Sequence, residues 1–482
     1  MQHCKKKRIL ALGSGIFFFS ANLVNAQLVD ETQTFPHVPG SAIAKSLEEQ
    51  IGTGQGEALI PGSSIYLIKR DSARSIRRGR QLFQRKFTAA QGQGPRVSAD
   101  GTGDIQENAA LGAGLADACA VCHGRPRGSA GFGGDVATRP DSRDSPHLFG
   151  LGLVEQLADE MTQDLRAIRA HAIRDATGSQ NIRSGKRKPG TITRDLVAKG
   201  INFGTVTAHA NGTLDTTGIE GVDEDFRVKP FFHQGGTVSI REFLIGAFKA
   251  EMGLEAWDPI LCAVTDPDNP QPMTSPAGFH YDPAADDFER PPVCSPNEDG
   301  DGDGVLAEID PALVDPMEFY LLNYFKSGRY KITRRTEKGL ALMNRIGCTS
   351  CHVQNLTINS DRRVADFETQ YDPQRGIFNQ LFATATTQFE AFDDGEECPQ
   401  LLPIEESFVV ESFFSDLKRH NLGPAFHERN YDGSLVTEFV TEPLWGVGTT
   451  APYGHDGRSI NLDAVSVAMV ARPKRPNKRM WY

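Results

Sequence analysis

Apolar and polar residues alternate with a helical period in two short stretches that lie far apart in the chain. Residues 75–87, SIRRGRQLFQRKF, carry an apolar stripe typical of a helix packed on one side, and residues 336–346, TEKGLALMNRI, carry a second. Each stretch precedes two cysteines that are three positions apart. Glycine, serine and proline break the pattern elsewhere, for example at 124–134 and in the Pro/Asp-rich stretch 266–303. We therefore expect a mainly α-helical chain with long loops.

Residues 1–26 have the order of a secretory signal peptide. Basic residues at 5–8 precede an apolar run over 9–24, and small residues lead to a cleavage site after Ala26. We expect export to the periplasm, where cysteines are oxidised or attached to cofactors. A retained membrane anchor is the alternative, although glycine and polar residues interrupt the run and it is short for a stable span. No other segment is long and apolar enough to cross a bilayer, so no stable membrane span is expected after cleavage.

The composition is that of a folded, soluble protein. The chain has 482 residues, of which 39% are hydrophobic and 23% charged. At about 100–200 residues per domain, this length accommodates two or three domains. Lys and Arg number 51 against 62 Asp and Glu, a net charge of -11. The acidic balance argues against nucleic acid as a main partner.

Two copies of one cysteine pattern dominate the candidate chemistry. The copies are Cys119-Ala-Val-Cys122-His123 and Cys348-Thr-Ser-Cys351-His352. CxxCH is the attachment pattern of c-type haem. Two thiols on one helical turn can each form a thioether to a porphyrin vinyl group, and the adjacent histidine then faces the iron. The alternatives are a redox disulfide, which needs a thioredoxin-like βαβ context, and half of a zinc site, which needs further Cys/His pairs.

A second repeat follows each CxxCH. Residues 233–240, HQGGTVSI, resemble residues 455–462, HDGRSINL. A duplicated haem domain explains both repeats. The expected organisation is a signal peptide at 1–26, an N-terminal extension at 27–74, an N-terminal haem domain at 75–325 with an acidic insertion at 262–311, and a C-terminal haem domain at 326–482.

These motifs together resemble those of the bacterial di-haem cytochrome c peroxidase superfamily, and within it the branch of di-haem or thiol oxidoreductases. The motifs are RGRQLFQRKF, CAVCHG, RDSPHLFGLG, FFHQGGTVSIREF, GLALMNRIGCTSCH and PLWGVGTTAPYGHDGRSINL. The resemblance extends over about 75–465. It implies two cytochrome c-like domains, two covalently bound c-type haems and a peroxidase-type oxidoreductase.

The resemblance also implies a division of roles between the haems. The C-terminal haem, with His352 as proximal ligand, receives electrons from a small redox protein or a quinol-linked donor. The N-terminal haem, with His123, meets hydrogen peroxide, whose reduction to water takes two electrons. Alternative functions are a non-catalytic electron-transfer cytochrome and a protein-modifying di-haem oxidase. A five-coordinate N-terminal iron that turns over peroxide would distinguish the peroxidase.

Three residues are candidates for the distal side of the first haem. Glu251, in KAEMG, matches the family's distal glutamate, whose carboxylate moves a proton between the two peroxide oxygens. A surface glutamate on a helix is the alternative. His147 is expected to be a packed or hydrogen-bonded loop residue. His233 occupies the place where the family has a tryptophan between the haems, so the route between the two irons must differ here.

The end of the chain departs from the family pattern. Met469 lies twelve residues after Gly457, where the family places the sixth ligand of the second haem, and Met would favour ferrous iron. The residues beyond 470 are basic and lack an apolar period. We interpret the tail after 465 as the product of a frameshift that replaced an ancestral histidine ligand. An uninterrupted natural reading frame ending at Tyr482 in several isolates would contradict this interpretation.

Calcium is a further candidate cofactor at two places. The resemblance implies an interhaem ion held by Asp144 and the backbone carbonyls of Thr450 and Pro452. Separately, an EF-hand-like loop is formed by Asp299, Asp301, Asp303 and Asp310. A solvated acidic loop is the alternative for the second place. The insertion is flanked by Cys262 and Cys294, which could form a disulfide that leaves Cys398 unpaired; the spacing does not decide this.

Overall fold

A computed structural model provides the structure of the protein. It describes residues 63–94, 116–124, 145–178, 190–325, 327, 332–371, 381–387, 389–393, 395, 400–403, 406–429, 434–448 and 450–470. The expected signal peptide, the proposed calcium ligand Asp144, Cys398 and most of the tail after 465 lie outside these residues.

The fold is mixed α/β, so the expectation of a mainly α-helical chain is wrong. Helix accounts for 37% and strand for 16% of the structure. The longest strands are β1 (Ile192–Ala198), β2 (Ile201–Ala208), β7 (Ala365–Tyr371) and β8 (Leu381–Thr387). Their segments are rich in Thr, Val, Ile and Phe, which favour strands. Lys199 and Gly200 join β1 to β2 with positive φ angles of 47° and 79°, the geometry of a tight hairpin turn.

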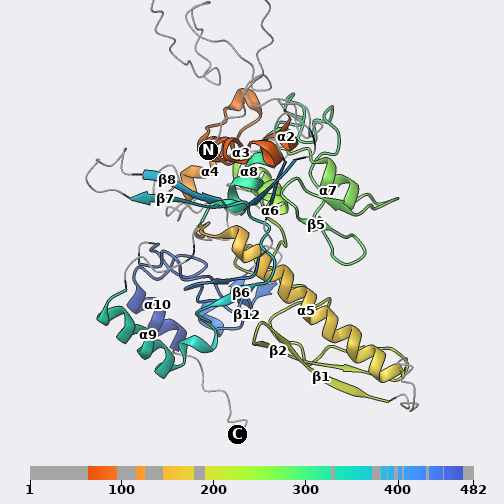
Figure 1. Cartoon of the computed structure of the whole chain (residues 1–482), viewed down its shortest axis with the longest axis vertical. Coiled ribbons are helices and arrows are strands. Elements are labelled where there is room, and N and C mark those ends of the chain that lie inside the picture. Colours follow the sequence, from red (N-terminus) through yellow and green to blue (C-terminus); the bar gives the residue numbers. More distant parts are fainter. Residues whose placement is uncertain are drawn as a thin grey trace, which may run out of the picture.

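A helical body forms the upper part of Figure 1. It contains α2 (Ser64–Arg70), α3 (Ser72–Gln84), α6 (Ile240–Ala247) and α8 (Pro311–Asn323). The helix predicted at 75–87 is confirmed over 75–84 as part of α3, which begins three residues earlier because Asp71 caps its N-terminus. The prediction is wrong for residues 85–87, which follow the helix. Every residue of α8 is buried. Gly79 allows α3 to approach α8 closely, since a Cβ there would lie 1.9 Å from the carbonyl oxygen of Pro316.

A buried ion cluster joins the elements of this body. The guanidinium of Arg241 in α6 contacts Asp258, which caps α7 (Pro259–Val264), at 2.5 Å. It also contacts Asp315 at 2.9 Å and Glu318 at 2.7 Å, both in α8. All four side chains are nearly inaccessible to solvent. Pairing and hydrogen bonding offset the cost of burying these charges.

The long helix α5 (Leu151–Thr177) runs diagonally away from the helical body and packs against β1 and β2 (Figure 1). β1, β2 and β3 (Leu214–Asp215) form an antiparallel sheet in that order. The first half of α5 is buried in the core, whereas its second half supports the sheet. No helix among the described residues is both long and apolar enough to cross a membrane.

The expected insertion 262–311 leaves and rejoins the body at adjacent points. Trp257 donates a backbone hydrogen bond to Ile309, and Ile309 donates one to Glu255. Cys262 and Cys294 form a disulfide within this segment, which decides the pairing that the sequence left open. The segment has two short strands, β4 (Met273–Thr274) and β5 (His280–Tyr281), and is otherwise turns and loops.

The C-terminal half consists of helices and short antiparallel strand pairs. The helix predicted at 336–346 is confirmed as α9 (Arg334–Ile346). The remaining elements are β6 (Leu356–Ile358) with β11 (Phe408–Val410), β9 (Phe389–Phe392) with β10 (Gln400–Pro403), β12 (Arg419–His420) with β15 (Phe439–Val440), β13 (Glu428–Arg429) with β14 (Leu435–Val436), and α10 (Leu462–Val470).

Candidate functional site

A largely apolar cavity lies where the first CxxCH meets the helical body. The space between its walls is about 1060 Å³ when the open solvent at its mouth is included. Its walls come from α4 (Cys119–His123), α6, η2 (Phe248–Met252) and the loop 145–148. The lining side chains include Phe83, Cys119, Cys122, His123, Ser145, Pro146, Leu148, Phe232, His233, Phe243, Leu244, Phe248, Glu251, Met252 and Leu321.

The helical turn α4 presents all three residues of the first CxxCH to this cavity. Residues three and four positions apart lie on one face of a helix, so Cys119, Cys122 and His123 point to the same side. Both cysteines carry free thiols. Burial raises the pKa of Cys119 to about 12 and also raises the pKa of Cys122. The structure therefore shows two protonated thiols beside an apolar space, not a disulfide.

His123 is held in the orientation of a metal ligand. Its Nδ1 lies 2.9 Å from the backbone carbonyl oxygen of Pro146. A carbonyl oxygen only accepts hydrogen bonds, so Nδ1 carries the proton and Nε2 keeps its lone pair. This arrangement is typical of histidines that bind metals. Burial lowers the pKa of His123 to about 4, which keeps the ring neutral.

Glu251 lies on the same cavity as the first CxxCH. It belongs to η2, a single π-helical turn that follows α6, and such turns occur often at functional sites. The backbone amide of Ala116 donates to the carbonyl oxygen of Glu251 at 3.1 Å, which joins the segment before α4 to η2. Glu251 is half-buried and lines the cavity, rather than standing on an exposed helix surface.

The two other distal candidates have different surroundings. His147 is confirmed as a hydrogen-bonded loop residue: its Nε2 lies 2.8 Å from the carbonyl oxygen of Pro443, and its Nδ1 accepts from the amide of Phe149. Both ring nitrogens are thus used by the backbone. His233 lines the cavity, and its Nδ1 lies 3.5 Å from the carboxylate of Glu442.

The second CxxCH repeats the orientation of the first histidine. Cys348 begins the short turn η3 (Cys348–Ser350), directly after α9. The Nδ1 of His352 lies 2.8 Å from the backbone carbonyl oxygen of Phe414. As in the first site, this contact leaves Nε2 available to a metal. The two histidines therefore share one arrangement although different segments supply the carbonyl groups.

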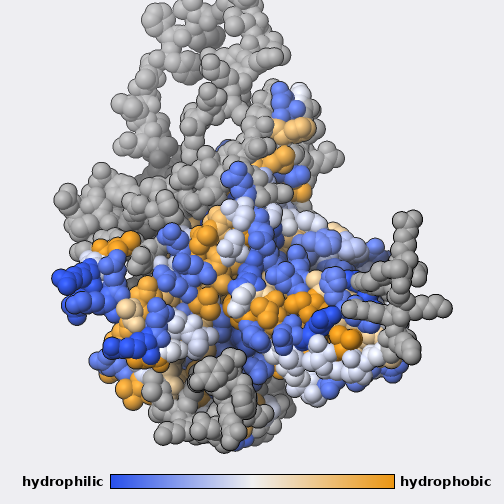
Figure 2. Space-filling view, turned by 60° about the horizontal axis from the view of Figure 1, so that its bottom comes forward, coloured by the Kyte–Doolittle hydropathy of each residue, from blue (hydrophilic) through white to orange (hydrophobic). Residues whose placement is uncertain are grey.

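Apolar side chains beside the second CxxCH are exposed. Helix α9 has no buried residue, although its sequence is amphipathic. Exposed apolar residues on or next to α9 and α10 are Ile332, Leu342, Ile346, Ile460, Leu462 and Val467. Figure 2, in which the lower part of Figure 1 comes forward, shows apolar side chains among hydrophilic ones on this face. Such a surface next to two thiols and a histidine suits a porphyrin, which would cover it.

No family model, curated protein or solved structure matches the chain. The function is therefore inferred from the site's own residues.

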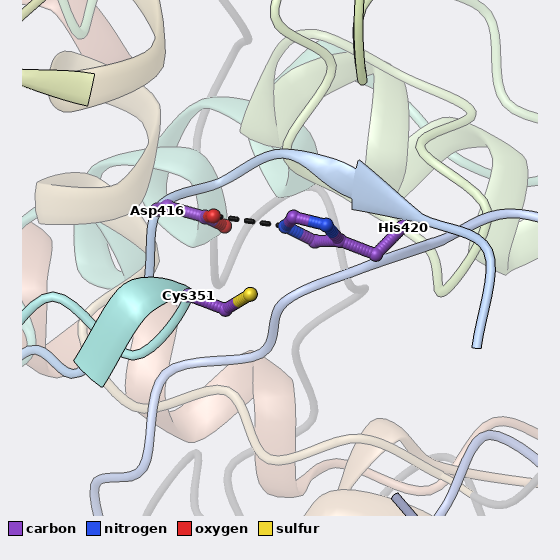
Figure 3. A group of neighbouring side chains, drawn as sticks. All are labelled: Cys351, Asp416 and His420. Carbon is purple, nitrogen blue, oxygen red and sulfur yellow. Dashed lines mark hydrogen bonds and ion pairs between the residues drawn. The ribbon is translucent and has the colours of Figure 1, made fainter. Parts of the chain in front are cut away.

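Sequence reasoning missed two residues that the structure places beside Cys351. Figure 3 shows Asp416 and His420 close to the thiol, with the Nε2 of His420 2.8 Å from a carboxylate oxygen of Asp416. The ligand atoms of all three residues lie within 4.8 Å of one another. The hydrogen bond from His420 lowers the pKa of Cys351. Burial by itself lowers the pKa of His420, but its hydrogen bonds to Asp416 and Cys351 outweigh burial and raise the pKa to about 9.

The predicted internal repeat is confirmed as a repeated loop. An antiparallel bridge joins Phe231 to Thr237, and an equivalent bridge joins Tyr453 to Ser459. Each bridge links the residue two before the histidine to the residue four after it. Helices α6 and α10 each begin seven residues after the respective histidine. The two loops meet, because the rings of His233 and His455 lie 6.4 Å apart.

In the acidic loop, aspartate carboxylates accept hydrogen bonds from the loop's own backbone amides. One oxygen of Asp299 accepts from the amides of Gly302 and Asp303, and the other accepts from Gly304. Asp299, Asp301 and Asp303 have carboxylate oxygens within 4.8 Å of one another. Asp310 instead caps α8 by accepting from the amide of Ala312. Asp301 also forms a group with Glu255 and Glu308, which sequence reasoning did not select.

Three other predicted ligands lie in the C-terminal half. Thr450 and Pro452 are half-buried in the loop before His455, and Met469 is half-buried in α10. Nothing in the sequence indicated that Asp416 and His420 lie beside the second CxxCH. Asp416 and His420 are separated from Cys351 by more than 60 residues, so only the fold brings them together.

Proposed function

We propose that the protein is an exported di-haem c-type oxidoreductase that reduces hydrogen peroxide to water. The observation that carries this proposal is the first cavity, on which Cys119, Cys122 and His123 lie together. The cavity has an apolar lining, and His123 directs the unprotonated Nε2 away from the Pro146 carbonyl. Cys348, Cys351 and His352 provide the same two thiols and imidazole at the second CxxCH.

The residues present fit two covalently bound haems. Each CxxCH offers two thiols for thioether bonds and one imidazole, whose Nε2 would hold the iron. Haem bound at both sites would supply the site of peroxide binding and the redox centre that receives electrons from a small redox protein or a quinol-linked donor. The disulfide between Cys262 and Cys294 supports an oxidising compartment such as the periplasm.

Within the cavity the protein's own groups handle protons and exclude water. Glu251 is the carboxylate that takes a proton from one peroxide oxygen and delivers it to the other. Phe232, Phe243 and Phe248 provide apolar walls, which strengthen electrostatic interactions inside the site. Pro146 fixes the tautomer of His123 through its carbonyl group.

The proposal is tested on protein exported with its own leader by a host that matures c-type cytochromes. Intact mass spectrometry should show the added mass of two haems, and Cys119→Ala with Cys122→Ala should remove one of them. The matched control is Cys262→Ala with Cys294→Ala, which removes two cysteines outside both sites and should keep both haems.

The holoprotein should then oxidise a reduced electron donor when hydrogen peroxide is added, and its N-terminal haem should be five-coordinate and high-spin. Two low-spin six-coordinate haems that are inert to peroxide would instead indicate an electron-transfer cytochrome. Mature protein without added haem mass would overturn the proposal.

A further inference from the structure

A carboxylate and a histidine connect solvent with the interior of the first cavity. The side chain of Glu442 is 38% exposed, whereas that of His233 is 12% exposed. His233 lines the cavity, and its Nδ1 lies 3.5 Å from a carboxylate oxygen of Glu442. One member of the pair thus reaches water while the other reaches the cavity.

Few lining groups among the described residues can carry protons. The titratable ones are Cys119, Cys122, His123, His233 and Glu251. In the proposed holoprotein the two cysteines are thioethers. The Nδ1 of His123 bonds to the Pro146 carbonyl, and its Nε2 would hold the iron. His233 and Glu251 are therefore the groups left to exchange protons with a bound substrate.

Hydrogen bonds to the backbone fix the two segments that carry His233 and Glu442. The carbonyl oxygen of His233 accepts a hydrogen bond from the amide of Val440 at 2.8 Å, at the end of β15. Glu442 follows two residues later, and the next residue, Pro443, accepts from His147. The His233 loop is itself closed by the bridge between Phe231 and Thr237. The loop of His233 and the segment 440–443 are therefore both held by hydrogen bonds.

Both a carboxylate and other histidines lie near His233. A carboxylate oxygen of Glu442 lies 3.5 Å from its Nδ1. The ring of His455, which pairs with Glu428 at 3.7 Å, lies 6.4 Å from the ring of His233. The other titratable groups around the pair are His147, which interacts electrostatically with both members, and the cavity residues Cys119, Cys122, His123 and Glu251. Imidazole can accept a proton at one ring nitrogen and release one from the other, so the ring of His233 is suited to relay protons.

We propose that Glu442 and His233 form the path by which protons from solvent reach the first cavity. This inference rests on the proposed function. Reduction of one hydrogen peroxide breaks the O–O bond and consumes two electrons and two protons, yielding two waters. The electrons come from the redox protein or quinol-linked donor. Each proton passes from water or Glu442 to Nδ1 of His233, and the ring releases one from Nε2 to the cavity.

The test compares steady-state peroxide turnover by holoprotein variants in H₂O and D₂O. His233→Gln should lower kcat by about 10²-fold, a usual effect of losing a proton-transferring side chain. Glu442→Gln, at a partly exposed position where folding is not at risk, should lower kcat by about 10-fold and increase the solvent isotope effect. KM for peroxide, haem content and the spin state of the first haem should stay unchanged in both.

Glu428→Gln is the matched control, because it alters the carboxylate beside the equivalent histidine, His455, which does not line the cavity. It should leave kcat and the isotope effect unchanged. Added imidazole should partly restore turnover to His233→Gly, which a purely structural role would not allow. Unchanged kcat and isotope effect in both pair variants would overturn this inference alone, whereas wild-type holoprotein without peroxide turnover would overturn it together with the proposed function.

Discussion

At the scale of single residues, backbone carbonyl groups determine which ring nitrogen of each CxxCH histidine is available to a ligand. The carbonyl oxygen of Pro146 accepts a hydrogen bond from Nδ1 of His123, and that of Phe414 accepts one from Nδ1 of His352. Neither carbonyl group could be inferred from the spacing of CxxCH, because one lies 23 and the other 62 residues away. The pattern nevertheless predicts which histidines they orient, since cysteine spacing and the adjacent histidine are local properties.

Glu251→Gln tests the acid/base role at the same scale. The amide keeps the shape of the side chain but cannot move a proton, so kcat for peroxide should fall by about 10²-fold or more. Haem content should not change. Stopped-flow and steady-state assays measure the effect. Glu220→Gln, on a side chain that is 67% exposed, is the control and should retain full activity; equal activity of the Glu251 variant would remove this residue from the chemistry.

At the scale of elements, the two helices that precede the CxxCH patterns each contain a glycine, but only one of these glycines is needed for close packing. Both helices were predicted from their apolar stripes. Gly79 in α3 lies against α8, whereas a Cβ on Gly339 in α9 would meet no atom of another described element within 4 Å. The sequence shows two similar glycines, and only the surroundings of each helix distinguish them.

Gly79→Ala should therefore destabilise the protein by about 1–3 kcal/mol, because the new methyl group overlaps the Pro316 carbonyl. Gly339→Ala should instead stabilise it by about 0.5–1 kcal/mol through higher helix propensity. Urea unfolding followed by circular dichroism measures both changes. Similar effects of the same sign would contradict the close contact between α3 and α8.

The ion cluster of Arg241 is also an element-scale feature, since it joins α6 to α8 and to the N-terminus of α7. Arg241→Met should lower the free energy of unfolding by about 3–5 kcal/mol, because three buried carboxylates lose their cation. Arg194→Met is the control: it removes a pair with Asp175 whose arginine is 46% exposed, and it should cost no more than about 1 kcal/mol. Comparable losses in the two variants, measured by urea unfolding, would contradict a structural role for the cluster.

At the scale of the whole molecule, α5 connects the N-terminal body to the segment that follows the second CxxCH. Glu160 accepts from the amides of Asn359 and Ser360, and Gln156 accepts from Arg362. Glu155 forms an ion pair with Arg362 and accepts from the amide of Ile240 at the start of α6. One helix thus fixes the position of one CxxCH half relative to the other.

Glu155 makes this connection dependent on pH. Burial raises the pKa of Glu155 to about 7. The charge of Arg362 lowers this pKa, whereas the charges of Asp159 and Glu318 raise it further. A raised carboxyl pKa means that the folded protein binds the proton more tightly, so this contribution to stability is complete below about pH 4.5 and is lost as pH rises through 7. Glu155→Gln should flatten the fall in unfolding free energy between these pH values, as urea unfolding at a series of pH values can show. An unchanged pH dependence would contradict the assignment, and Glu220→Gln provides the control with an unaltered slope.

The local and repeating features of this protein follow from its sequence alone. These are the two CxxCH patterns, the helices before them and the loops around His233 and His455, because each depends on residues close together in the chain. The strands of the mixed α/β fold also have local signals, because β1 with β2 and β7 with β8 pair neighbouring segments that are rich in strand-favouring residues. Tertiary structure decided how these hairpins and the helices pack together. It also decided that Asp416 and His420 lie beside Cys351. Such neighbours are far apart in sequence, and only burial of the common core brings them together.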